Sequence, residues 1–256
     1  TVSIYPTLIP KQIQYIINNS HTKAVFVENT EQLDKINSIL SDCPTIKAIV
    51  VMDKTYKNSD GIVYGINDFI DMGTDFQNKS EISFESLIES IDENSLLTLI
   101  YTSGTTGSPK GVMLTHKNIM SNINDVSNEI FFDKNDKFLS FLPLSHIFER
   151  TCGHFTPFSK GASIYYAESI EKVPENLSEV GPTVVTSVPR LYEKMYSRIK
   201  DGLKSAPAIR RKLFAWALEV GSDSLSHKLA NKNLPFLLKI KNSIASKLVY
   251  SKVKNR

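Results

Sequence analysis

The sequence predicts an α/β fold with layered, mostly parallel sheets flanked by helices, followed by a helical C-terminal segment. Short apolar runs alternate with amphipathic stretches over most of the chain. That alternation is typical of strands joined by helical crossovers, which places them parallel in a sheet. The last fifty or so residues show apolar residues at helical spacing only. Together these patterns exclude an all-β or a disordered chain.

The individual elements follow from local periodicity. Strands are expected at the short apolar runs 24–27, 47–52, 96–101, 112–114, 138–142, 162–166 and 183–186. Helices are expected near 11–19, 31–40, 115–130, from 147 onward, 173–180 and 190–200. Thr115 suits a helix N-cap, because its hydroxyl accepts a hydrogen bond from a first-turn amide. Residues 53–80 are rich in Asp, Asn and Gly, which predicts a long surface connection.

Composition limits the class of protein. The 256 residues are 41% hydrophobic and 22% charged, values typical of a folded domain long enough to bury a core. No apolar run approaches the ~18 residues of a membrane span, and no signal peptide is recognisable. Cys43 and Cys152 lie far apart in sequence, which favours two free thiols over a disulfide framework. A cytoplasmic protein is therefore expected, and the first residue, Thr1, suggests a fragment.

Charge is distributed unevenly. Residues 204–256 carry 12 Lys or Arg but only Glu219 and Asp223, a net charge of +10. The first 203 residues carry −7, consistent with +3 for the whole chain. Two apolar stripes lie within the basic region: Ile209, Leu213, Trp216 and Val220, then Leu237, Ile240, Ile244 and Leu248. Such stripes usually pack on the protein's own core. The alternative is peripheral contact of this region with an anionic membrane; nucleic acid is not expected as a partner.

A loop rich in hydroxyls and glycine follows the strand at 96–101. It offers short donors, backbone amides free to form an anion-binding nest, and one lysine. Its candidate phosphate-binding residues are Thr102, Ser103, Gly104, Thr105, Thr106, Gly107 and Lys110. The P-loop pattern fails because Ser108-Pro109 precedes Lys110, and the dinucleotide pattern fails as well. The alternative is a flexible Ser/Gly linker between two strands.

The string from Thr102 to Gly111 resembles the signature loop of the adenylate-forming, or AMP-binding, superfamily. The stretch from Leu142 to Arg150 is similar to the next core motif of that family. Ser187–Glu193 resembles the long-chain fatty acid CoA ligase (acyl-CoA synthetase) branch in particular. Further similar strings are 5–8, 23–27, 214–217 and 248–253, so the resemblance runs through nearly the whole chain.

The resemblance implies a two-step ligase. A fatty acid carboxylate would react with ATP to give an acyl-adenylate, and coenzyme A would then displace AMP, with Mg²⁺ assisting. The loop residues would grip pyrophosphate, and Lys110 and His146 would be catalytic. No metal ligand is assigned. The alternatives are adenylation of another carboxylic acid, such as an aryl or amino acid, and a non-catalytic phosphate- or membrane-binding remnant.

The resemblance also implies an incomplete domain. Residues 1–256 correspond to part of the AMP-binding domain. The family's later motifs for adenine, magnesium and ribose are not found, nor are its hinge and its small C-terminal lid domain. The fragment is therefore expected to be inactive by itself.

Other histidine and charged motifs favour structural roles. Ser145 precedes His146 without the G-x-S-x-G elbow of a serine hydrolase. His146 and His154 are not at the i, i+4 spacing of a helical zinc site. Glu149 and Arg150 are expected to form a local ion pair or to hold the loop.

Overall fold

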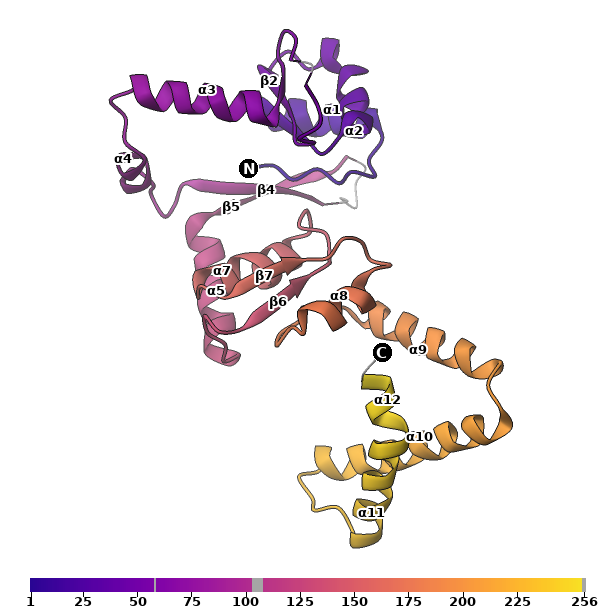
Figure 1. Cartoon of the computed structure of the whole chain (residues 1–256). Coiled ribbons are helices and arrows are strands. Elements are labelled where there is room, and N and C mark those ends of the chain that lie inside the picture. Colours follow the sequence, from indigo (N-terminus) through magenta and orange to yellow (C-terminus); the bar gives the residue numbers. More distant parts are fainter. Residues whose placement is uncertain (58, 103–107, 255–256) are drawn as a thin grey trace. The chain divides into compact units, whose positions relative to one another are not determined.

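The computed structural model describes residues 1–57, 59–102 and 108–254, and it divides into two units. The first unit contains residues 1–134 and 143–162, and the second contains residues 135–142 and 163–256. Figure 1 shows the order of the elements along the chain.

A three-stranded parallel sheet forms the first core, in the order β1 (Ala24–Val27), β2 (Ala48–Val51), β3 (Val63–Gly65). The helices α1 (Pro10–Asn19) and α2 (Thr30–Asn37), with the 3-10 turn η1 (Leu40–Asp42), belong to the same N-terminal segment. Their apolar faces pack on the sheet through eleven buried residues: Ile13, Ile17, Val25, Val27, Leu33, Ile36, Ile39, Cys43, Ile46, Ile49 and Val51. The alternation expected from the sequence is confirmed here, because α2 connects two parallel strands.

The expectation of a surface connection over residues 53–80 was wrong. This stretch contains β3 and the helix α3 (Ile66–Lys79). Gly65 joins them where a Cβ atom would lie 2.8 Å from the carbonyl oxygen of Tyr56, so only glycine fits. Phe69 of α3 meets Phe26 of β1 edge to face, with ring centroids 5.8 Å apart. Apolar residues at helical spacing therefore outweighed the loop-like composition. A short helix, α4 (Phe84–Glu89), follows and was not foreseen either.

The strands β4 (Leu96–Thr102) and β5 (Lys110–Thr115) form an antiparallel pair, the exception to the mostly parallel prediction. Thr115 caps α5 (His116–Glu129) as expected, accepting a hydrogen bond from the Asn118 amide at 3.2 Å. Residues 147–159 then form one continuous helical stretch. It consists of α6 (Ile147–Glu149), the π-helical turn η2 (Arg150–Phe155) and α7 (Thr156–Ser159).

The second unit contains the parallel pair β6 (Lys137–Ser140) and β7 (Ser163–Tyr166) and the helix α8 (Val173–Val180). The strand expected at 183–186 is reduced to a single bridge between Val184 and Phe138. Four helices follow: α9 (Pro189–Lys204), α10 (Ala208–Leu229), α11 (Phe236–Ala245) with its π-helical extension η3 (Ser246–Tyr250), and α12 (Ser251–Lys254). The helical C-terminal segment is therefore confirmed.

The two apolar stripes of this segment differ. Ala217 and Val220 of α10 pack against Ala245 and Val249, with Trp216 and Leu213 beside them. Most of the first stripe is therefore core, as expected, although Ile209 at its start is 80% exposed. The second stripe lies largely outside this core. Among the described residues, no helix is both long and apolar enough to cross a bilayer.

Candidate functional site

The predicted phosphate-binding segment connects β4 to β5. The antiparallel register places Thr102 directly opposite Lys110, and both residues are exposed. Paired residues in such a ladder have Cα atoms about 5 Å apart. The ends of the segment are therefore held close together, as a compact anion-binding loop requires. The remaining predicted loop residues, Ser103, Gly104, Thr105, Thr106 and Gly107, lie outside the described residues.

Two tyrosines attach this end of the hairpin to α1. The Tyr15 hydroxyl donates to the carbonyl oxygen of Pro109 at 3.0 Å, and the Tyr101 hydroxyl donates to Asn19 Oδ1 at 2.6 Å. Their rings meet edge to face at 6.4 Å. Burial raises the pKa of Tyr101, which keeps its hydroxyl protonated and able to donate. Gly111, opposite Tyr101, leaves room for this ring, since a Cβ there would lie 3.0 Å from the ring.

His146 lies at the start of the helical stretch 147–159. It is the N-cap of α6, and its Nδ1 accepts a hydrogen bond from the Phe148 amide at 3.2 Å. A ring nitrogen that accepts must be unprotonated, so the neutral imidazole carries its proton on Nε2. The side chain is exposed. His146 therefore carries an N–H donor on an exposed side chain.

Arg150 connects the His146 turn to β4. Its Nε donates to the carbonyl oxygen of Leu144 at 3.0 Å, and its guanidinium donates to Thr98 Oγ1 at 2.8 Å. Thr98 is fully buried in the middle of β4, four residues before Thr102. Burial lowers the pKa of Arg150 without neutralising it, because a guanidinium stays charged in proteins. The expected structural role of Arg150 is confirmed, and the arginine links the turn that carries His146 to the strand that leads into the loop.

Glu149 is fully buried beside this link. Its carboxylate packs against Gly153, where a Cβ atom would overlap it. Burial and the Glu149 charge together raise the pKa of the Cys152 thiol, so Cys152 stays protonated. The glycine therefore makes space for a buried carboxylate inside the π-helical turn.

A metal centre does not emerge from the described residues. Within them, no three His, Cys, Asp or Glu side chains gather closely enough to hold a metal ion. His154 stacks on Phe158 with ring centroids 6.4 Å apart, and burial lowers its pKa. Its neighbours thus include an aromatic ring and, through its charge, Arg150.

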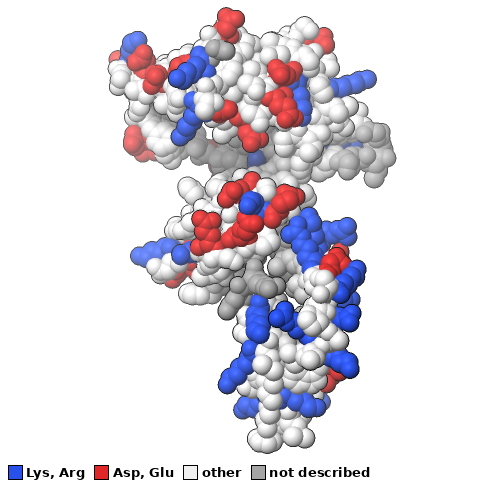
Figure 2. Space-filling view, turned by 45° about the vertical axis from the view of Figure 1, so that its right-hand side comes forward, with Lys and Arg blue, Asp and Glu red and all other residues white. Residues whose placement is uncertain are grey.

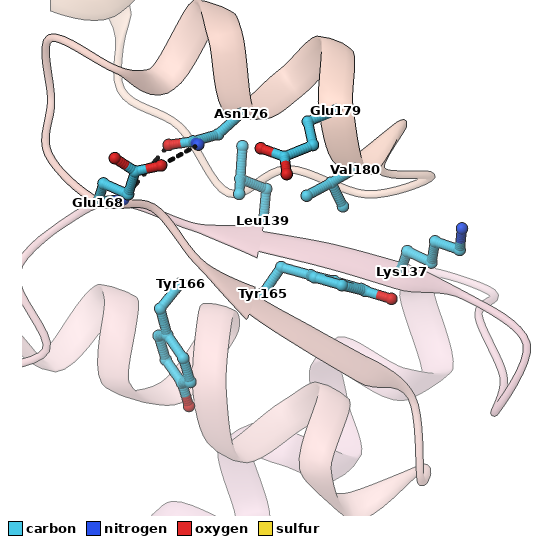
Figure 3. Close-up of a pocket in the computed structure, with 8 residues that line it drawn as sticks. All are labelled: Lys137, Leu139, Tyr165, Tyr166, Glu168, Asn176, Glu179 and Val180. Carbon is cyan, nitrogen blue, oxygen red and sulfur yellow. Dashed lines mark hydrogen bonds between the residues drawn. The ribbon is translucent and has the colours of Figure 1, made fainter.

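A cavity in the second unit was not foreseen from the sequence. Its volume is about 420 Å³, and its lining comes from β6, β7, the turn after β7 and α8: Lys137, Leu139, Tyr165, Tyr166, Glu168, Asn176, Glu179 and Val180 (Figure 3). The Asn176 amide exchanges two hydrogen bonds with Glu168, at 3.3 and 3.4 Å, which fixes the turn after β7 against α8. None of the predicted phosphate-binding or catalytic residues lines it. Its residues carry no local motif, because they come together only when β6, β7 and α8 pack.

Comparison with known proteins decides the family. The model of the AMP-binding enzyme family matches residues 1–238. The chain belongs to the AMP-binding enzyme family. The resemblance drawn from the signature string is thereby confirmed.

The curated relatives of this AMP-binding chain are fatty acid ligases. It is 35% identical to the human long-chain-fatty-acid–CoA ligase ACSBG2 over 99% of its own length and 38% of the relative's. It is 29% identical to the peroxisomal long chain acyl-CoA synthetase 7 of Arabidopsis thaliana, over 100% of its own length and 35% of the relative's. The chain thus spans little more than a third of the length of these relatives.

Solved structures confirm the α/β fold class of this AMP-binding chain. One neighbour is the anthranilate CoA ligase AuaEII in complex with anthranoyl-AMP, with a TM-score of 0.62, 23% identity, and coverage of 76% of this chain and 36% of the other. Another is the adenylation domain of a carboxylate reductase from Mycobacterium chelonae, with a TM-score of 0.63, 22% identity, and coverage of 81% and 34%. At these identities the likeness concerns the fold alone.

Proposed function

We propose that this AMP-binding chain holds the phosphates of ATP in the β4–β5 connection and contributes that site to a long-chain fatty acid CoA ligase. The observation that supports the proposal most directly is the antiparallel register of β4 and β5, which sets Thr102 opposite Lys110 at the two ends of the connecting segment. The family match and the names of the curated relatives support the reaction class. The substrates are ATP, a long-chain fatty acid and coenzyme A.

The reaction proceeds in two balanced steps. A carboxylate oxygen attacks the α-phosphorus of ATP, the bond from that phosphorus to the β-phosphate oxygen breaks, and pyrophosphate leaves. The sulfur of coenzyme A then attacks the acyl carbon, loses its thiol proton, and AMP leaves. The first step brings anions together, so fixed positive charge and oriented donors lower its barrier.

Two described residues have direct roles in this proposal. Lys110 neutralises charge on the departing pyrophosphate, assisted by Thr102, Ser103, Gly104, Thr105, Thr106 and Gly107 as the loop's donors. The Nε2–H of His146 donates to the carboxylate or to the α-phosphate oxygen, because Nδ1 is already occupied by the Phe148 amide. Arg150 keeps that turn attached to β4 and acts as a positioning residue.

The described residues do not form a Mg²⁺ site, since they lack an oxygen-rich cluster of the kind this cation prefers. No step is therefore assigned to a protein-bound metal. Mg²⁺ enters the proposal only as the ion that accompanies ATP.

The proposal extends to the scope of the chain. We propose that residues 1–256 form part of an adenylation domain and that these residues alone do not catalyse acyl-CoA formation. The two free cysteines support a cytoplasmic location. The proposal includes peripheral contact of the basic region 204–256 with an anionic membrane, which its net charge of +10 supports (Figure 2).

Nucleotide binding tests the site directly. The 256-residue chain is titrated with a fluorescent ATP analogue, and pyrophosphate is added as competitor. Replacing Lys110 with Ala should weaken binding roughly 10- to 100-fold, the range for one lost charged hydrogen bond. Lys47→Ala, which removes an exposed lysine next to β2, should leave binding unchanged. If both variants bind like the unaltered chain, the phosphates lie elsewhere and the proposal fails.

Exchange of labelled pyrophosphate into ATP tests the chemistry. The assay uses a protein of the relatives' full length that contains this chain, with palmitate, benzoate or amino acids as the acid. Palmitate-dependent exchange supports the proposal, whereas exchange with benzoate or amino acids alone would assign another acid. His146→Asn keeps a capping acceptor but removes the distal N–H, so it should lower exchange while ATP binding stays normal. His146→Gln should recover part of that loss. Acyl-CoA formation by the 256 residues alone would contradict the proposed inactivity.

A further inference from the structure

The lysine of the signature string directly follows a proline. Pro109 has no amide N–H to donate, and its ring holds the backbone angle φ at about −65°. The carbonyl group of Pro109 and the backbone nitrogen of Lys110 belong to one planar peptide group. A contact that holds this carbonyl therefore also fixes the direction in which the chain enters Lys110.

That carbonyl is held by a side chain of α1. The Tyr15 hydroxyl donates to Pro109 O at 3.0 Å, although the two residues are ninety-four positions apart in sequence. Tyr15 is half-buried, and its helix is anchored by Ile13 and Ile17, which belong to the core of the first sheet. The hydroxyl thus comes from a rigid element, which holds a bonded atom more precisely than a loop does.

The side chain of Lys110 is available to a ligand. It is exposed, and no ion pair within residues 1–57, 59–102 and 108–254 involves it. Lysine carries its charge on a flexible four-carbon side chain, so the ammonium group is not positioned by the side chain itself. The orientation of the preceding peptide group is therefore what the fold can use to direct this charge.

Tyr101 makes a contact of a different kind at the same end of the hairpin. Its hydroxyl also joins the hairpin to α1, but it donates to a side-chain atom, Asn19 Oδ1, at 2.6 Å. This bond holds β4 and does not involve the peptide group between Pro109 and Lys110. The two tyrosines form a matched pair, because each contributes one hydroxyl bond between α1 and the hairpin and only Tyr15 bonds the peptide group that leads into Lys110.

We propose that Tyr15 is a positioning residue of the phosphate-binding site. Its hydroxyl fixes the peptide group between Pro109 and Lys110, and the fixed backbone directs the lysine ammonium at the pyrophosphate portion of ATP. The inference rests on the proposed function, because it requires that Lys110 binds phosphate. Tyr15 acts through the backbone and does not itself contact the nucleotide.

Nucleotide titration of hydroxyl-deletion variants tests this role. The 256-residue chain is titrated with a fluorescent ATP analogue, and pyrophosphate is the competitor. Tyr15→Phe keeps the ring and removes only the hydroxyl, so it should weaken binding roughly three- to tenfold, the range for one neutral hydrogen bond. Tyr101→Phe also removes one bond to α1 but should leave binding unchanged. Hydrogen exchange of peptides covering β4 and β5 should show a similar loss of protection in both variants. If the two variants lose affinity equally, Tyr15 contributes only to folding and the proposal fails.

Combination with Lys110→Ala separates positioning from a general loosening of the hairpin. In that background there is no ammonium to direct, so Tyr15→Phe should cause no further loss of affinity. In pyrophosphate exchange by a protein of the relatives' full length, Tyr15→Phe should raise the KM for pyrophosphate and leave kcat nearly unchanged, since it weakens only the hold on that group. An equal loss of affinity in both backgrounds, or a fall in kcat at unchanged KM, would overturn the proposal.

The same titrations distinguish failure of this inference from failure of the proposed function. If Lys110→Ala leaves ATP binding unchanged, the proposed phosphate site is wrong and the role of Tyr15 falls with it. If Lys110→Ala weakens binding and Tyr15→Phe does not, only the role of Tyr15 is wrong.

Discussion

Replacing Arg150 by methionine removes the guanidinium that joins the His146 turn to β4. The side chain makes one hydrogen bond to Leu144 O at 3.0 Å and one to Thr98 Oγ1 at 2.8 Å. Hydrogen bonds from charged groups contribute about 1.5–3 kcal/mol each to stability. Because Arg150 is partly exposed, we expect each of its two hydrogen bonds to contribute near the lower end of that range. The free energy of unfolding of the first unit should therefore fall by about 3 kcal/mol.

A double-mutant cycle with Thr98→Val isolates the contact with β4. Valine keeps the shape of threonine but removes the hydroxyl, which also donates to Thr1 O at 3.0 Å. The two single changes should not add, and the coupling free energy should be about 1 kcal/mol or more. A coupling below about 0.3 kcal/mol would refute the idea that this bond joins the turn to the strand.

The assay must report on the correct unit. The chain has one tryptophan, Trp216, and it lies in the second unit. Native-state hydrogen exchange of peptides covering β4 and residues 143–150 follows the first unit instead. Arg190→Met is the control, because that side chain is 88% exposed in its ion pair with Glu193 and should change stability by no more than about 0.5 kcal/mol.

Two further changes test the helical stretch 147–159. Gly153→Ala should destabilise the first unit by about 1–3 kcal/mol, because the new methyl group overlaps the buried Glu149 carboxylate. The control is Gly202→Ala in α9, where the new methyl group meets nothing within 4 Å and should stabilise the helix slightly. Urea unfolding of each variant measures both changes. The pKa of His154 is lowered from its ordinary 6.5, first by burial and then by a neighbouring arginine, so the unfolded chain binds the proton more readily. Stability of the first unit should therefore be complete above about pH 6.5 and decrease as the pH falls toward the folded-state pKa, and His154→Phe, beside Phe158, should flatten this dependence. An unchanged pH profile in that variant would assign the effect to other groups.

Much of the chain could be predicted where short-range signals agree. The helix 173–180 was expected at the bounds observed, and Thr115 caps α5 as its hydroxyl suggested. The signature string 102–111 identified the family without any structure, because glycines, hydroxyls and one lysine in that order are a specific chemical requirement. The catalytic and phosphate-binding roles of its residues, and that of His146, stay predictions.

Other features depended on partners distant in sequence. Residues 66–79 include Asn, Asp and Gly, which favour loops, yet they form the helix α3. Phe69 of this helix contacts Phe26 of β1. In the sequence, Arg150 follows Glu149 directly, which suggests a local ion pair. In the structure, the guanidinium of Arg150 donates a hydrogen bond to Thr98, which is fifty-two residues away. Tertiary contacts override local propensity in such cases, because packing contributes more than the few tenths of a kcal/mol that separate most residues in helix propensity.

The sequence by itself determined the α/β alternation, the family, the signature string and the basic charge of the last fifty residues, since each is a property of composition or local order. Only the tertiary structure decided that β4 and β5 run antiparallel with Thr102 beside Lys110. It also decided which of two similar apolar stripes became core and which stayed exposed on α11 and η3. Periodicity shows that a helix has an apolar side, but the packing partner alone determines whether that side is buried.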